Sequence, residues 1–176
     1  MLGFQNSLVK LVILWFPSHD PVVGTYHSNT VLPEAFGDEI YEESKHFGKC
    51  IVAPENNKFD QTILKAKQLG ANIYKTKQGK TLKTLSIGNP TFVYGWNTNS
   101  LTKSKMLADL RKAVNDGLLQ LNDPNLIQEA KSFTRNDLID KEPDPRLVTR
   151  HFDLLTACAI AWQMKDVAEA EVTDTP

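Results

Sequence analysis

Two carboxylates in the sequence stand where a fold can hold an acidic side chain rigidly. The first is Asp153, which comes early in residues 149–164. Positions 154–162 are apolar except for Thr156, which predicts a core helix covered on most faces. With Thr149 as N-cap, Asp153 would lie in the first turn, where the positive helix end favours a carboxylate by roughly 0.3–1 kcal/mol. Asp153 is then either a helix-stabilising charge or a metal ligand.

The second carboxylate, Glu55, follows a predicted strand. Residues 50–53 form a short apolar run with β-branched members, which predicts a strand buried on both faces. Pro54 removes the next ladder donor and ends the strand. Glu55 therefore stands at a carboxyl end, the edge where ligands bind in open α/β sheets. A turn acid before Asn56 and Asn57 fits the same residues.

Lysines gather directly after Glu55. Between positions 58 and 83 the only acid is Asp60, against Lys58, Lys65, Lys67, Lys75, Lys77, Lys80 and Lys83. Such a cluster is either a solvated helix face with a basic loop or a surface that contacts phosphates without reading base sequence. Trp96 could stack on a base or pack beside Gly95.

The order of predicted elements indicates how these residues are positioned. We expect an opening hairpin from residues 8–16 and 22–27, with the first strand central. Strands at 49–53, 72–75, 118–121 and 133–138 then alternate with helices at 33–47, 59–69, 101–115, 124–131 and 149–164. An antiparallel hairpin followed by parallel strands predicts an α/β fold with a mixed sheet flanked by helices, an order that fits a ribonuclease H-like sheet.

Composition bounds the class of protein. A chain of 176 residues with 41% hydrophobic residues predicts one domain, residues 1–165, with a flexible tail at 166–176. The net charge of −1 predicts no bulk attraction to nucleic acid. Cys50 and Cys158 lie in apolar runs, which predicts buried, reduced thiols. No apolar stretch approaches the roughly 20 residues of a membrane-spanning helix, so we expect a soluble, intracellular protein.

Four stretches follow one another in a definite order and spacing: Ala53-Pro54-Glu55-Asn56-Asn57, Gly95-Trp96-Asn97-Thr98, Thr102-Lys103 and His151-Phe152-Asp153-Leu154-Leu155. They resemble the strand-ending acid with paired asparagines, the Gly-Trp-x-Thr loop with a following basic residue, and the His-Asp-Asp-Leu-like helix opening of a known family, the nuclease domain of tailed-phage terminase large subunits. The agreement covers almost the whole chain.

The resemblance implies a ribonuclease H-like endonuclease that hydrolyses double-stranded DNA with two Mg²⁺ or Mn²⁺ ions. Glu55 and Asp153 would be the catalytic ligands, with carboxylates about 4–8 Å apart around ions roughly 4 Å apart. Asp144 is a weaker candidate ligand, on a loop before the last helix. The expected DNA contacts are Lys58, Lys75, Lys77, Lys80, Trp96 and Lys103.

Two departures from the family pattern affect the expected activity. Phe152 replaces the first Asp of the helix pair, so only Asp153 matches. The family's first catalytic Asp belongs on the opening strand, and here no acid precedes Asp20. We therefore expect weak cleavage, with a non-catalytic DNA-binding packaging domain of the same fold as the alternative. Another ribonuclease H-like enzyme, a resolvase or integrase, fits the paired asparagines and the Gly-Trp-x-Thr loop less well. His151 is left without a role.

The implied setting is genome packaging. In the family, this cut ends packaging at the capsid, so the expected partners are DNA, a portal protein and a small terminase subunit, in the cytoplasm of a bacterial host. A complete large subunit also carries an ATPase motor. No Gly-x-x-x-x-Gly-Lys phosphate loop occurs here, so we expect no motor in this chain.

Overall fold

The chain has a mixed α/β structure that divides into two compact units. The computed structural model describes residues 9–14, 20–28, 30–48, 50–56, 60–77, 92–134, 137 and 152–167. The first unit comprises Met1–Val31 with Asn99–Pro176, and the second comprises Leu32–Thr98. The described residues form five helices, a three-stranded sheet and a two-stranded sheet. The predicted single domain ending at residue 165 stays a prediction.

The first unit holds a mixed sheet built on the opening hairpin. Strand β1 (Val9–Leu14) pairs antiparallel with β2 (Asp20–Ser28), which confirms the predicted hairpin. Strand β5 (Leu119–Gln120) then joins β2 in parallel. Among the described strands β2 is therefore the middle one, whereas the sequence favoured residues 8–16 as central. Among the described strands, the parallel neighbour of the hairpin is β5.

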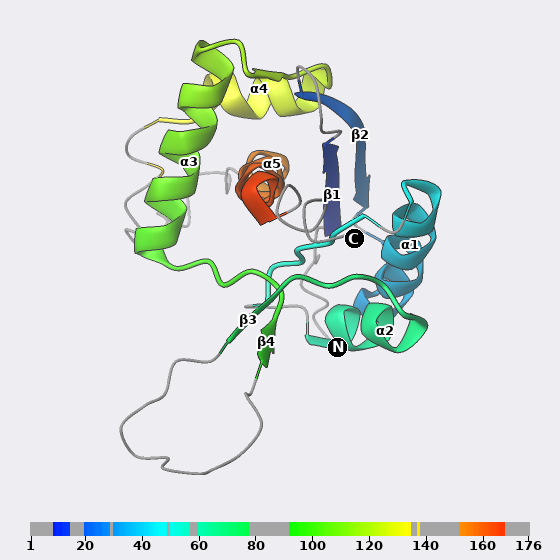
Figure 1. Cartoon of the computed structure of the whole chain (residues 1–176). Helices are drawn as coiled ribbons and strands as arrows, with labels where there is room; N and C mark the ends of the chain where they lie inside the picture. The colour runs from blue at the N-terminus through cyan, green and yellow to red at the C-terminus, as the bar shows by residue number, and fades with distance from the viewer. Residues whose placement is uncertain are drawn as a thin grey trace, which may run out of the picture. The chain divides into compact units, whose positions relative to one another are not determined.

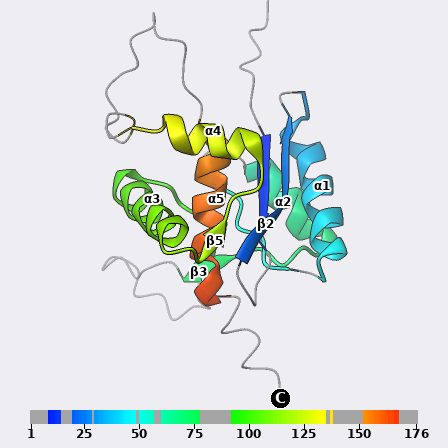
Figure 2. The same ribbon diagram turned by 90° about the horizontal axis from the view of Figure 1, so that it is seen from above.

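Helix α5 (Asp153–Gln163) forms the core of the first unit. It contacts β1, α3 (Ser100–Asn115) and α4 (Pro124–Ser132), and Figures 1 and 2 both show it between α3 and the β1–β2 hairpin. Covered on these sides, α5 buries Leu154, Leu155, Cys158, Ala159 and Ile160. The predicted core helix is confirmed, because a helix with apolar residues nearly all round needs partners on several faces.

The predicted start of the last helix is wrong. Helix α5 begins at Asp153, and its N-cap is Phe152, whose side chain makes no capping hydrogen bond. The proposed N-cap, Thr149, lies outside the described residues. Phe152 has φ −111° and ψ 45°, and its ring packs edge-to-face on Phe133 with centroids 5.0 Å apart. Phe152 is therefore outside helical geometry, and the helix begins at Asp153.

Sequence signals located helices α3 and α4 well, because each begins at a recognisable cap. Helix α4 follows Asp123, whose side chain accepts a hydrogen bond from the Leu126 N–H at 2.7 Å. Helix α3 follows Asn99, which forms a capping box with Thr102. No helix in the part of the chain that the structure describes is long and apolar enough to cross a membrane.

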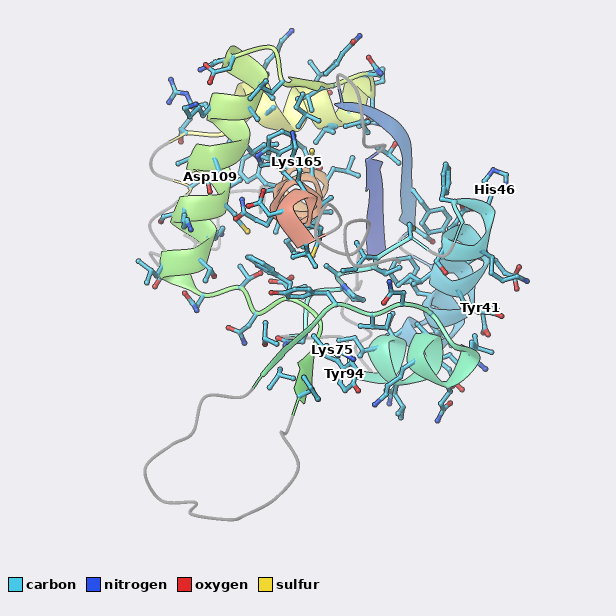
Figure 3. All side chains as sticks on the ribbon, in the orientation of Figure 1. Tyr41, His46, Lys75, Tyr94, Asp109 and Lys165 are labelled. Carbon is cyan, nitrogen blue, oxygen red and sulfur yellow. The ribbon has the colours of Figure 1, made fainter. Side chains whose placement is uncertain are left out.

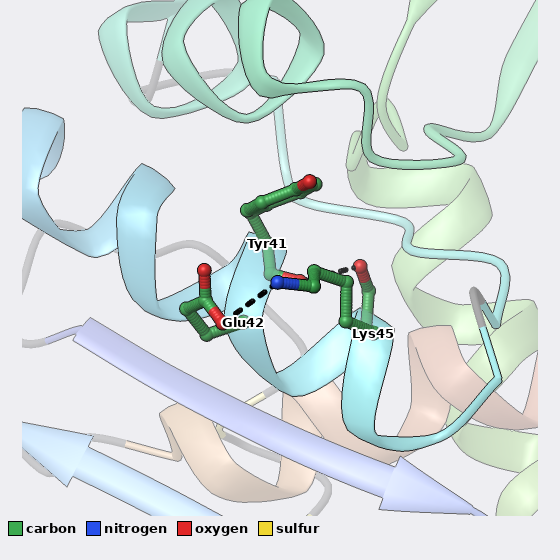
Figure 4. Close-up of polar contacts among 4 residues, drawn as sticks. Tyr41, Glu42 and Lys45 are labelled. Carbon is green, nitrogen blue, oxygen red and sulfur yellow. Dashed lines mark hydrogen bonds and ion pairs between the residues drawn. The ribbon is translucent and has the colours of Figure 1, made fainter.

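The second unit pairs two helices at close range. Helices α1 (Pro33–His46) and α2 (Asp60–Leu69) pack through Gly37, where an added Cβ would lie 2.7 Å from the Lys65 Cβ. The fully buried Thr62 hydroxyl donates to the Pro33 carbonyl at 2.6 Å. On the outer side of α1, the Lys45 ammonium lies 3.3 Å from a Glu42 oxygen (Figure 4). Both side chains of that pair are exposed.

The short strands differ most from expectation. In the second unit, β3 (Lys75–Lys77) pairs antiparallel with β4 (Phe92–Tyr94). The expected parallel pair, residues 49–53 and 72–75, is reduced to one parallel bridge between Val52 and Ile73. In the first unit, no strand occurs at the described part of residues 133–138, because Phe133 caps α4 and Asp137 accepts from the Thr134 N–H at 2.7 Å, closing a tight turn.

Candidate functional site

The acid Glu55 and the loop that begins at Gly95 lie side by side in the second unit. Glu55 and Trp96 form a parallel β-bridge: the Trp96 N–H donates to the Pro54 carbonyl at 2.7 Å, and the Asn56 N–H donates to the Trp96 carbonyl at 2.9 Å. Earlier in the same segment, Val52 pairs with Ile73 instead. Residues 52–55 thus change their backbone partner along their length. Val52 pairs with Ile73, whereas Glu55 pairs with Trp96.

Gly95 makes this close approach possible. Its φ of +83° is in the left-handed region, and an added Cβ would lie 2.6 Å from the Pro54 carbonyl oxygen and 2.9 Å from the Ile63 Cδ1. Any side chain at this position would therefore meet backbone as well as helix α2. The Gly95 N–H also donates to the Tyr74 carbonyl at 2.8 Å. The glycine is required by both its conformation and its surroundings.

Asn56 fastens the same contact through its side chain. Its Nδ2 donates to the Tyr94 carbonyl at 3.2 Å, and its Oδ1 accepts from the Asn97 Nδ2 at 3.3 Å. The first of the paired asparagines therefore bridges the strand before the loop to the residue after Trp96. The second, Asn57, lies outside the described residues. Glu55 is half-buried beside this amide network.

Trp96 packs as a structural side chain. Its ring lies 6.0 Å from that of Tyr74, centroid to centroid, with the planes tilted by 35°. The indole Nε1 is buried and has no hydrogen-bond partner among the described residues. The side chain as a whole is half-buried, so the packing interpretation is supported, and base stacking stays a prediction.

Asp153 lies at the first helical position of α5 in the first unit and is half-buried. The Leu155 N–H, two residues later, donates to a carboxylate oxygen of Glu129 at 2.9 Å. Glu129 belongs to α4, so another helix caps α5. Glu129 could not be predicted from the sequence, because no local pattern connects residues 26 positions apart. The one available hint was that Phe152, directly before Asp153, cannot cap a helix with its side chain.

The lysines of the cluster fall into different environments. The Lys65 ammonium lies 3.4 Å from an Asp38 oxygen, which joins α2 to α1. The Lys67 ammonium lies 3.8 Å from the centre of the Tyr94 ring, and that of Lys75 lies 5.0 Å from the Phe92 ring. Figure 3 shows Lys75 and Tyr94 together on the β3–β4 ribbon, where they are directly opposite in register. Lys65 is therefore structural, whereas Lys67 and Lys75 are exposed cations beside aromatic rings.

The other predicted site residues are only partly described. Lys77 belongs to β3 and is paired in register with Phe92 of β4. Lys103 lies on α3 in the first unit and is half-buried. Residues outside the described part of the chain are Lys58, Lys80, Lys83, Asp144 and His151.

The metal site stays a prediction. Glu55 belongs to one unit and Asp153 to the other. Within the described ranges, no group of three or more His, Cys, Asp or Glu side chains is arranged to hold a metal ion.

Comparison with protein-family models finds no match to the chain, and comparison with curated proteins finds none.

Proposed function

We propose that this chain is a metal-dependent endonuclease domain that cleaves double-stranded DNA during phage genome packaging, like the terminase large-subunit nucleases it resembles. The observation that carries the proposal is the pairing of Pro54-Glu55-Asn56 with Gly95-Trp96-Asn97. These stretches carry much of the resemblance, and they are far apart in the sequence. Their backbone pairing makes one local structure of the acid and the loop.

The fold supports the same proposal at a coarser level. The sheet combines an antiparallel hairpin with a parallel strand, and helices pack on it. We propose that this arrangement is ribonuclease H-like, with α5 as the helix that carries the last carboxylate.

In the proposed mechanism, Glu55 and Asp153 are the ligands of hard divalent cations. Carboxylate oxygens fit Mg²⁺ and Mn²⁺, so the residue types suit the role. Bound ions would supply an activated water and charge stabilisation of the leaving 3′ oxygen. Glu55 is held by its bridge to Trp96, and Asp153 by the first turn of α5. Asp144 is proposed as an auxiliary acid.

DNA would be held by lysines through its phosphates. The exposed Lys67 and Lys75 ammonium groups each lie over an aromatic ring. The proposed contacts are Lys58, Lys75, Lys77, Lys80, Lys103 and Trp96. Such contacts position DNA without selecting a base sequence. The proposed partners are a portal protein and a small terminase subunit, at the capsid in the cytoplasm of a bacterial host.

The test is cleavage of supercoiled plasmid with Mn²⁺, using Glu55→Gln and Asp153→Asn. Exposed acids provide matched controls: Glu39→Gln in the second unit and Asp166→Asn in the first. We expect slow cleavage that EDTA stops, a loss of at least about tenfold in each site variant, and no change in the controls.

Three other outcomes of these experiments would argue against the proposed function. Cleavage by both site variants at the rate of the wild-type protein would refute the assigned ligands. DNA binding without cleavage at any Mn²⁺ or Mg²⁺ concentration would favour a non-catalytic packaging domain. A marked preference for four-way junctions over plain duplex would favour a resolvase.

A further inference from the structure

The first turn of α5 is capped from outside the helix. The first N–H groups of a helix have no partner within it and need acceptors from elsewhere. Phe152 offers no side-chain acceptor, and the Leu155 N–H is bonded instead to the Glu129 carboxylate at 2.9 Å. This bond joins an ionised acceptor to the positive end of a helix, the arrangement in which such bonds are strongest.

Contacts to α4 lie on both sides of Asp153. The residue before it, Phe152, packs edge-to-face on Phe133, with ring planes at 84°. Two residues after it, the Leu155 N–H is held by Glu129. Phe133 is the C-cap of α4, and Glu129 lies in its last turns. A single helix and its C-cap thus fix the backbone on either side of the proposed ligand.

Helix α4 is itself tied to the sheet. Its N-cap, Asp123, accepts a hydrogen bond from the Thr25 hydroxyl of β2 at 2.9 Å with one carboxylate oxygen, and its other oxygen caps α4 at Leu126. The position of Asp153 therefore follows from a chain of contacts that runs from β2 through α4 to the start of α5. Glu129 is the polar connection at the end of that chain.

We infer that Glu129 is a positioning residue for Asp153: by binding the Leu155 N–H it holds the first turn of α5 where the Asp153 carboxylate can bind a divalent cation. This role rests on the proposed function, because it gives Asp153 a metal to bind. It differs from simple capping, which would affect stability alone, and from a role for Glu129 as a ligand.

Two conservative variants separate the effect of the length of the Glu129 side chain from the effect of its charge. Glu129→Gln keeps an oxygen at the same distance from the backbone but loses the charge. Glu129→Asp keeps the charge but withdraws the oxygen by one methylene. The measured quantity is the Mn²⁺ dissociation constant, from the electron paramagnetic resonance signal of free Mn²⁺, with melting temperature measured in parallel. Asp153→Asn is the control for the metal site itself.

If Glu129 positions Asp153, Glu129→Asp should weaken Mn²⁺ binding roughly tenfold, at the lower end of what loss of an outer-shell partner causes, and Glu129→Gln should stay within about threefold of wild type. The inference is overturned if both variants lose melting temperature but bind Mn²⁺ like wild type, since capping is then only structural. It is also overturned if Glu129→Gln is the weaker binder, since the charge then acts directly.

Failure of the proposed function has a different signature. In that case Asp153→Asn binds Mn²⁺ as wild type does, or wild type binds none, and Glu129 has no ligand to position. A normal loss in Asp153→Asn combined with unchanged Glu129→Asp would leave the proposed function standing and remove only the role of Glu129.

Discussion

Gly95 is the residue on which the contact between Glu55 and the Gly-Trp-Asn loop depends most directly. Gly70 provides a comparison in the same unit, because both glycines have positive φ: +83° at Gly95 and +95° at Gly70. Their surroundings differ. A Cβ at Gly95 would meet the Pro54 carbonyl at 2.6 Å, whereas a Cβ at Gly70 would meet nothing within 4 Å.

We therefore predict that Gly95→Ala destabilises the protein more than Gly70→Ala. Gly70→Ala should cost about 1 kcal/mol, from backbone strain alone. Gly95→Ala should cost about 1–3 kcal/mol more, because steric overlap is added to the strain. Urea unfolding of both variants measures the difference. Equal losses would show that Pro54 and Ile63 can move aside, and that the loop is held less tightly than its geometry implies.

At the scale of elements, the close packing of α1 on α2 is set by one small residue. Gly37 is buried at the crossing, and the ion pair from Lys65 to Asp38 joins the same two helices. In an isolated helix, alanine would be the better residue by about 1 kcal/mol. Here its Cβ would lie 2.7 Å from the Lys65 Cβ and 3.0 Å from the Thr62 carbonyl oxygen.

We predict that Gly37→Ala lowers the free energy of unfolding by about 1–2 kcal/mol, since overpacking outweighs the gain in helix propensity. The exposed Glu39→Ala in the same helix should change it by less than about 0.5 kcal/mol. Thermal or urea unfolding decides. A Gly37→Ala variant more stable than wild type would mean that the helices separate to admit the methyl group at little cost.

Helices could be predicted from the sequence far better than strands, for a physical reason. A helix bonds to itself, and α3 and α4 carry their N-caps in their own sequence, at Asn99 and Asp123. A strand depends on a neighbour that the sequence does not name. Residues 50–53 thus form a single bridge, and the two-residue β5 becomes the parallel partner of β2.

The candidate site could be predicted only in part for the same reason, because its contacts join residues far apart in the sequence. Glu55 and Gly95 could be singled out separately from their local patterns, but their pairing is a tertiary contact. Glu129 carried no signal in its own surrounding sequence, because it caps a helix backbone 26 residues away. Residues that act through space on a distant backbone group leave no periodic pattern to find.

For the whole molecule, a net charge of −1 means that the proposed DNA binding would depend on how the lysines are distributed. We predict that the triple variant Lys75→Glu, Lys77→Glu, Lys80→Glu binds unrelated duplexes more weakly than wild type, and all of them to the same extent. The slope of log affinity against log salt concentration should become shallower by up to about 0.9 for each lost phosphate contact. Binding assays over a range of salt concentrations test this.

The control for charge reverses a pair of exposed lysines outside the cluster. Lys45 pairs with Glu42, and Lys112 with Asp116. Their double replacement by Glu should leave the salt slope nearly unchanged. If the control weakens binding as much as the cluster variant does, then total charge and not the Lys58–Lys83 cluster governs DNA binding.

Thiol titration gives the stability a dependence on alkaline pH. Burial raises the pKa of Cys158 from 9.0 to about 12 and also raises that of the half-buried Cys50. The folded state thus keeps a proton that the unfolded chain loses above about pH 9. The stabilising contribution is complete below that pH and is lost as pH rises toward 12, by up to about 1.4 kcal/mol per pH unit for Cys158.

We predict that Cys158→Ala removes most of this slope. The variant should be less stable than wild type at pH 7.5 by about 1 kcal/mol, because the methyl group leaves a small cavity, and the difference should shrink as pH rises above 9. Urea unfolding from pH 7.5 to 10.5 provides the comparison. Parallel curves for the two proteins would show that the thiol does not titrate with unfolding.

The central claim is that Glu55 and Asp153 bind the same divalent cations, and a double-mutant cycle on Mn²⁺ affinity tests it most directly. If the two carboxylates share ions, Glu55→Gln and Asp153→Asn should each weaken Mn²⁺ binding nearly as much as the double variant, because removing either ligand dismantles the site. Electron paramagnetic resonance of free Mn²⁺ measures all four proteins. Additive losses, or affinities equal to that of wild type, would contradict a shared metal site.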